Sequence, residues 1–232
     1  NPEEEWLGVV KKEAQMKTGW HKDILPLMME QLYDTKYLKF TSGEPLMIPH
    51  VRKIIKKLYD EEVSPAVRLS IITNGTIPLD AEMLKMLLTF KRVLFIVSVD
   101  GLGKRFEYIR AGSNWQEIEK NLQQFKKIET MHDNFGLKIN FLPMAVNAAQ
   151  HDEAEQWAKK NKYEFSHSVE IYRPKYLTYA SLNAKLRDRY NITSHYEYDE
   201  EQYQQLLKHM AIKDKLSGSN FKEACPEFFE DE

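Results

Sequence analysis

The chain contains very little cysteine, since Cys225 is the only one among its 232 residues. One cysteine excludes a disulfide within the chain. It also excludes any zinc or iron–sulfur centre whose ligands are all cysteines of this chain. The composition therefore excludes disulfide-rich scaffolds, and it excludes metal centres that this chain builds from cysteines alone.

The sequence also lacks long apolar runs and an excess of charge of one sign. Apolar runs such as residues 93–97 are far too short to cross a membrane, and the acidic start at residues 1–5 is unlike a signal peptide. Thirty-three Lys and Arg residues against 35 Asp and Glu residues give a net charge of −2, so no overall field favours nucleic acid. We therefore expect a cytoplasmic protein without a membrane partner and without a strong nucleic-acid signal.

Common catalytic and nucleotide-binding motifs are missing as well. No Gly-x-Ser-x-Gly segment is present, which argues against a serine hydrolase. The seven histidines include no His-x-His pair, and we expect no metal site from them. The segment GLGK at residues 101–104 leaves a flavodoxin-like nucleotide-binding domain as an alternative, although Phe106 stands where the dinucleotide fingerprint needs glycine.

Short β-rich runs alternate with runs of helical period, which indicates an α/β fold of βαβ units around a parallel sheet. Strands are expected at residues 37–40, 67–72, 93–97, 137–142 and 165–172. Helices are expected at residues 51–59, from 80, from the cap Asn114 to about 125, and at 152–160. We divide the chain into an N-terminal helical segment (1–34), a βα core (35–172) and a C-terminal extension (173–232) with a helix over 199–212 and a loose end at 216–220.

Polar residues gather where the first three predicted strands end, at residues 41–44, 73–74 and 98–100. Ligands of parallel α/β folds bind beyond the carboxyl ends of the strands. Ordinary caps and turns use the same residue types, so one such cluster indicates little. Three in succession predict a pocket for a small polar ligand, and a carboxylate beside a glycine, as at Glu44 and Gly43, suits an ammonium group.

The order of four segments resembles radical S-adenosylmethionine (SAM) enzymes. They are TSGEP at residues 41–45, TNGT at 73–76, SVDG at 98–101 and YIRAG at 108–112. Within that superfamily the chain looks most like the twitch or SPASM-type branch of phage and bacterial genomes, over residues 20–172. The resemblance implies a partial (β/α)6 TIM-like barrel with about five parallel strands present.

The resemblance also implies a SAM amino-group site at the end of the first predicted strand. The family's Gly-Gly-Glu-Pro motif has Ser42 in place of its first glycine and keeps Gly43 and Glu44. Glu44 is therefore the expected contact of the methionine ammonium.

Further SAM contacts are implied at the next strand ends. Asn74, Ser98 and Asp100 match positions that face the ribose and methionyl parts, and Asn147 is expected near adenine or ribose. Arg110 matches an arginine that pairs with the SAM carboxylate, for which a guanidinium fork is well shaped. No residue is assigned a catalytic role.

The family's reaction uses a 4Fe-4S cluster held by three cysteines spaced Cys-x3-Cys-x2-Cys, and this chain has only Cys225. The cluster and an electron donor allow reductive cleavage of SAM to a 5′-deoxyadenosyl radical, which abstracts hydrogen from a substrate, here unknown. One hypothesis is a truncated enzyme whose cluster loop lies upstream of Asn1, inactive as this fragment alone. The other is a cluster-free binding or scaffold domain that keeps the SAM pocket.

Overall fold

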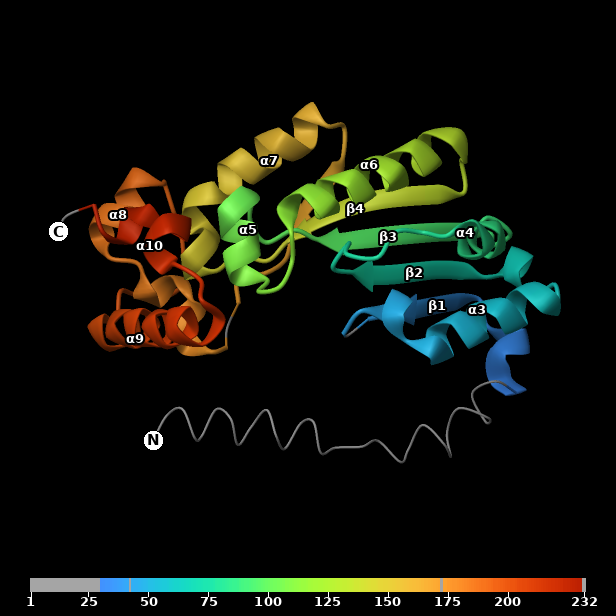
Figure 1. Cartoon of the computed structure of the whole chain (residues 1–232), viewed down its shortest axis with the longest axis horizontal. Coiled ribbons are helices and arrows are strands. Elements are labelled where there is room, and N and C mark those ends of the chain that lie inside the picture. The colour runs from blue at the N-terminus through green and yellow to red at the C-terminus, as the bar shows by residue number, and fades with distance from the viewer. Residues whose placement is uncertain (1–29, 42, 172, 231–232) are drawn as a thin grey trace.

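The structure, a computed structural model, describes residues 30–41, 43–171 and 173–230 of the chain. Five parallel strands form one sheet in the order β1-β2-β3-β4-β5 (Figure 1). The strands are β1 Tyr37–Phe40, β2 Arg68–Thr73, β3 Arg92–Ser98, β4 Phe135–Phe141 and β5 Glu164–His167. The predicted α/β class with five parallel strands is confirmed.

The strand order separates a partial barrel from a flavodoxin-like sheet. In doubly wound folds the order reverses at a switch point, whereas in a (β/α) barrel each strand pairs with the next one along the chain. Here every strand of the described part pairs with its neighbour in sequence. The flavodoxin-like alternative is therefore wrong.

Helices connect the strands and bury one face of the sheet. The helices of this core are α3 Pro49–Asp60, α4 Ala81–Leu87, α5 Gly103–Ile109, α6 Trp115–Met131 and α7 His151–Lys160. In β3, Val93, Phe95 and Val97 are fully buried in the main apolar cluster, while Leu94 and Ile96 between them are partly exposed. This period of two follows from the pleat of a strand and leaves one sheet face more open than the other.

Most predicted boundaries differ from the structure by a few residues. Asn114 caps α6 as expected, its Oδ1 accepting from the Glu117 N–H at 3.1 Å. The fifth strand was predicted over 165–172, and this is wrong for the described residues 168–171, which follow the end of β5 at His167. The Ser168 N–H still donates to the Phe141 carbonyl at the end of β4, and beyond it the Ile171 N–H donates to the Pro143 carbonyl, where β4 has already ended.

The described residues also contain short 3₁₀ helices. They are η1 Gln31–Asp34, η2 Pro45–Met47, η3 Ser64–Ala66, η4 Ala145–Gln150, η5 Lys175–Leu177, η6 Tyr179–Ser181 and η7 Pro226–Phe228. The predicted N-terminal helical segment lies outside the described residues except for its last residues, which form η1.

The C-terminal extension packs beyond the carboxyl ends of the strands, since the arrowheads of β2 and β3 point toward it in Figure 1. Its helices are α8 Ala184–Arg189, α9 Glu200–Ser217 and α10 Phe221–Ala224. A second apolar cluster joins them to Tyr108 of α5 and to η4. The predicted loose end at 216–220 is wrong, because Gly218 ends α9 with a left-handed φ of 66° and Asn220 caps α10.

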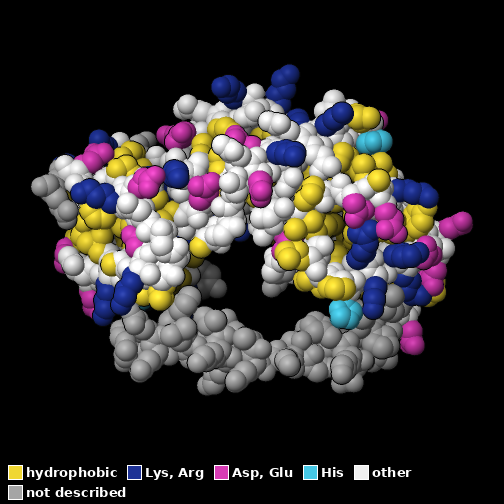
Figure 2. Space-filling view, viewed as in Figure 1, with side chains coloured by type: hydrophobic (Ala, Val, Ile, Leu, Met, Phe, Trp, Pro, Cys, Tyr) yellow, Lys and Arg dark blue, Asp and Glu magenta, His cyan; other side chains and the backbone are white. Residues whose placement is uncertain are grey.

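The surface carries no broad field of one sign on the face seen in Figure 2, where basic and acidic side chains are interspersed. None of the helices in the described ranges has the length and apolar character needed to cross a membrane.

Candidate functional site

Glu44 stands just beyond β1 and is held by the end of β2. Its Oε2 accepts from the Asn74 N–H at 2.8 Å, and its Oε1 accepts from the Leu46 N–H at 3.2 Å. The Thr73 hydroxyl lies 2.8 and 2.9 Å from the two carboxylate oxygens. The structure thus brings together Glu44 and Asn74, which the sequence placed at neighbouring strand ends.

The Glu44 carboxylate keeps capacity for one more donor. Two oxygens offer about four lone-pair sites. Two backbone N–H groups take two of them, and the Thr73 hydroxyl, which has a single proton, can donate to only one oxygen at a time. A partly exposed carboxylate in this state can accept from an ammonium group, and Thr73 orients it.

The residues around Glu44 shape the turn. Gly43 has a left-handed φ of 59°, which favours glycine there. The Asn74 side chain is used locally, its Oδ1 accepting from the N–H and the hydroxyl of Thr76. Ser42 lies outside the described residues.

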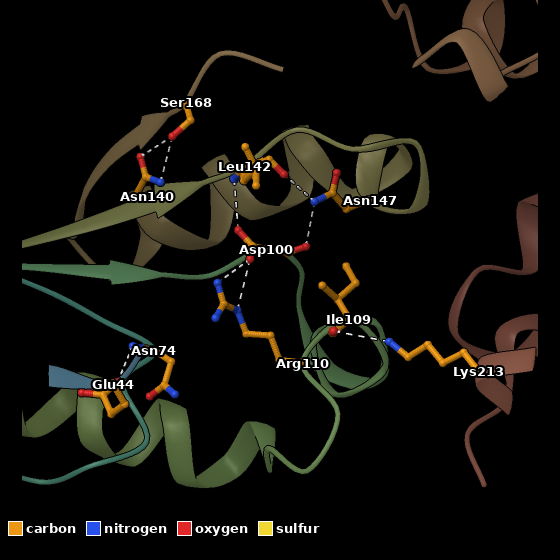
Figure 3. A network of polar contacts seen from close by, with 10 residues as sticks. All are labelled: Glu44, Asn74, Asp100, Ile109, Arg110, Asn140, Leu142, Asn147, Ser168 and Lys213. Atoms are coloured by element: carbon orange, nitrogen blue, oxygen red, sulfur yellow. Dashed lines mark hydrogen bonds and ion pairs between the residues drawn. The ribbon is translucent and has the colours of Figure 1, made fainter. Parts of the chain in front are cut away.

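Asp100 and Arg110 form an ion pair beyond β3 (Figure 3). Asp100 Oδ2 accepts from Arg110 Nε at 3.1 Å and from Nη2 at 2.5 Å, while Oδ1 accepts from the Leu142 N–H at 3.1 Å. The Arg110 side chain is 28% exposed, against 6% for Asp100. A guanidinium has five N–H donors, so Arg110 keeps donors for an anionic ligand while Asp100 holds it in place.

Asn147 is fully buried and braces the Asp100 loop. Its Nδ2 donates to the Asp100 and Leu142 carbonyls at 2.9 Å, and its Oδ1 accepts from the Met144 N–H at 2.7 Å. Both amide hydrogens are therefore used inside the protein. The Asn147 amide joins the segments that follow β3 and β4 and does not face open space.

Ser98, a predicted site residue, belongs to a polar row on the more open sheet face whose other members, Asn140 and Ser166, were not predicted from the sequence. Ser98, Asn140 and Ser166 are in register on β3, β4 and β5. Asn140 Nδ2 donates to Ser168 Oγ at 3.0 Å (Figure 3). The signal was present, since Lys138 and Asn140 alternate with apolar residues along β4. The carboxyl edge of the sheet therefore carries Glu44 beyond β1, Asp100 beyond β3 and Asn140 near the end of β4.

Cys225 does not fit the role of an iron ligand. It is fully buried, and its Sγ donates to the Val146 carbonyl at 3.3 Å. Burial raises the pKa of the thiol to about 12, whereas metals bind the thiolate. No group of three or more His, Cys, Asp or Glu side chains in the described ranges is arranged to hold a metal ion. The residues of this chain therefore do not fit a 4Fe-4S cluster.

The sheet order and the polar strand ends define an α/β protein of the partial-barrel class, with a candidate ligand site at the carboxyl edge of the sheet. The family model of the radical SAM superfamily matches residues 22–139, which is half of the chain. The chain belongs to this superfamily. None of the curated proteins matches it.

Three solved structures of SuiB from Streptococcus suis resemble the chain at 14% identity. The complex with S-adenosylmethionine has a TM-score of 0.46 and covers 89% of this chain and 44% of SuiB. The complex with the precursor peptide SuiA has a TM-score of 0.45, with 83% and 40% covered. A third SuiB structure gives 0.46, with 89% and 45%. The chain spans less than half of SuiB, and at this identity the likeness says nothing about its ligand or substrate.

Proposed function

We propose that this chain binds SAM at the carboxyl edge of its sheet. Glu44 accepts from the methionine ammonium, and Arg110, held by Asp100, donates to the methionine carboxylate. Ser98 and Asn140 offer hydroxyl and amide groups to the ribose. The observation that carries the proposal is the pair of unsaturated charged groups, Glu44 and Arg110, on one sheet edge of a radical SAM superfamily member.

We propose further that this chain does not cleave SAM by itself. Reductive cleavage in the superfamily uses a three-cysteine cluster, and Cys225 is buried and protonated. Hydrogen abstraction from a substrate would belong to a longer protein that supplies the missing cysteines and takes an electron donor, and the order of the four segments favours the twitch or SPASM-type branch. A cluster-free SAM-binding domain is the alternative, and the single cysteine favours it.

Calorimetry with SAM and with 5′-methylthioadenosine tests the binding site, because the second compound lacks the amino-acid part. Glu44→Gln removes the negative charge and should weaken SAM binding about tenfold, since hydrogen bonds to charged groups contribute about 1.5–3 kcal/mol. Binding of methylthioadenosine should stay unchanged. Glu153→Gln, an exposed carboxylate on α7, is the matched control. Absence of SAM binding by the wild-type chain would contradict the proposal.

Anaerobic iron–sulfide reconstitution separates the two functional alternatives. This chain should gain no cluster absorbance. The full-length gene product should gain it if the radical enzyme is correct. A full-length product that binds SAM and takes up no iron would establish the cluster-free domain instead.

A further inference from the structure

A buried ion pair connects helix α5 to the C-terminal extension. Arg105 Nη2 lies 2.7 Å from Glu227 Oε2, and the two side chains are 6% and 5% exposed. Arg105 Nε also donates to the Ala224 carbonyl at 3.0 Å. The two charged residues are 122 positions apart in sequence, so only the folded extension brings them together.

The Arg105–Glu227 ion pair is expected to contribute little to the free energy of unfolding. Arg105 Nη1 and Glu227 Oε1 are buried and have no hydrogen-bond partner among the described residues. Each buried ion loses several kcal/mol of solvation, and apolar side chains of similar volume often stabilise a protein as well or better. The pair does fix the orientation of α5, because the planar guanidinium can donate to a carboxylate and a carbonyl together only in a defined geometry.

The end of α5 leads directly into the proposed SAM site. Lys213 of α9 donates to the Tyr108 and Ile109 carbonyls at the end of the helix. Arg110 follows as the C-cap, its N–H donating to the Phe106 carbonyl at 2.8 Å. Figure 3 shows Lys213 reaching Ile109 and Arg110 extending to Asp100. The C-terminal extension therefore fixes the position of the end of α5, from which the Arg110 side chain extends to the carboxyl edge of the sheet.

A second contact from the same C-terminal residues reaches Asp100 by another route. Cys225 donates to the Val146 carbonyl of η4. The next residue, Asn147, donates to the Asp100 carbonyl. The segment 224–227 thus contacts both elements that position the Asp100–Arg110 pair.

We propose that Arg105 and Glu227 are positioning residues that hold α5 where Arg110 can receive the carboxylate of SAM. The proposal rests on the proposed SAM site. It assigns the C-terminal extension a role in ligand binding at a distance, through Arg110, without contact between Glu227 and the ligand.

Backbone amide exchange and SAM affinity test this role together. The Leu142 N–H donates to Asp100 and reports on the Arg110 side, while the Asn74 N–H donates to Glu44 and serves as the internal reference. Glu227→Leu should speed exchange at Leu142 and weaken SAM binding, each about tenfold. Exchange at Asn74 and the affinity for 5′-methylthioadenosine should not change. Glu223→Gln is the matched control, because Glu223 of α10 also pairs with a basic residue of α5, Lys104, at 3.9 Å, and this pair is exposed.

The double variant Arg105→Met/Glu227→Leu separates positioning from packing. It should recover thermal stability, since no unpaired buried charge remains, and it should keep the fast Leu142 exchange and the weak SAM binding. Recovery of all three together would overturn the proposal, as would a Glu227→Leu variant with unchanged Leu142 exchange. A wild-type chain that binds no SAM, with exchange as expected, would contradict the proposed function and leave the positioning of Asp100–Arg110 supported.

Discussion

Glu44 and Arg110 lie at the same edge of one sheet, but the contacts that hold them come from very different distances along the chain. The partners of Glu44 are at most 30 positions away, at the end of the neighbouring strand. Arg110 depends on α5, whose anchor Glu227 is 122 positions from Arg105. One half of the site is therefore built within consecutive βα units, and the other is built across the core and the C-terminal extension.

The apolar clusters differ in the same way. The main cluster contains the buried strand residues with α3, α4, α6, α7 and Phe106 of α5, and it supports the end of β2 beneath Glu44. The second cluster contains η4, α8, α9 and α10, together with Tyr108 of α5. Damage to the second cluster should therefore loosen the Arg110 half and spare the Glu44 half.

The largest effect is expected from Leu206→Ala, in the middle of α9. Leu206 is fully buried in the second cluster, so the truncation should lower the free energy of unfolding by about 2–5 kcal/mol. Urea unfolding measures the loss. Amide exchange at Leu142 should become faster, while exchange at Asn74 stays as in the wild type.

Ile71→Ala is the matched control in the main cluster. Ile71 of β2 is fully buried, so we expect a loss of the same size. Because β2 pairs with both β1 and β3, exchange should rise at both reporter amides. Equal rises at Leu142 and Asn74 in Leu206→Ala would show that the two halves are not supported separately.

A smaller, pH-dependent effect is expected from Cys225. Burial raises the pKa of its thiol from 9.0 to about 12. Above pH 9 the unfolded chain loses a proton that the folded chain retains, so stability is fully present below pH 9 and is lost as pH rises toward 12. The slope is at most about 1.4 kcal/mol per pH unit.

Urea unfolding of the wild type and Cys225→Ala at pH values of about 8 and about 10 measures this slope. The variant should lose less stability over the interval, and the titration of tyrosines cancels in the comparison. Identical slopes in the two proteins would show that the thiol ionises as easily in the folded state as in the unfolded state.

The smallest effect is expected at Arg52, which makes an exposed counterpart of the Arg105 pair. Arg52 contacts Asp80 and Glu82, and these side chains are 39%, 57% and 63% exposed. Arg52→Ala should lower the free energy of unfolding by about 0.2–1 kcal/mol, because solvent screens such pairs. Thermal unfolding measures it. If Arg52→Ala lowered the free energy of unfolding as much as Glu227→Leu does, exposed and buried arginine pairs would not differ in their contribution to stability.

Local patterns in the sequence were enough to predict the parallel sheet and to place several site residues at the ends of its strands. Short β-rich runs between runs of helical period predicted all five strands, and Asn114 predicted the start of α6. Helix α5 was missed because its seven residues are too short to show a clear period. Thr73 was predicted to lie at a polar strand end, but its contact with Glu44, 29 positions away, was not, and Asn140 was missed as a site residue because its partner Ser168 is 28 positions away.

The sequence by itself determined the radical SAM resemblance, the parallel sheet and the lack of three cysteines for a cluster, since each depends on residue types and short spacings. Only the tertiary structure decided that Asn147 braces the Asp100 loop and that Glu227 reaches Arg105. Contacts that span 47 and 122 positions leave no local period in the sequence. These contacts form because the apolar face of the extension is buried against α5 and η4, which brings Arg105 and Glu227 together. Burying either charge without its partner costs so much free energy that only arrangements in which the two groups pair are stable.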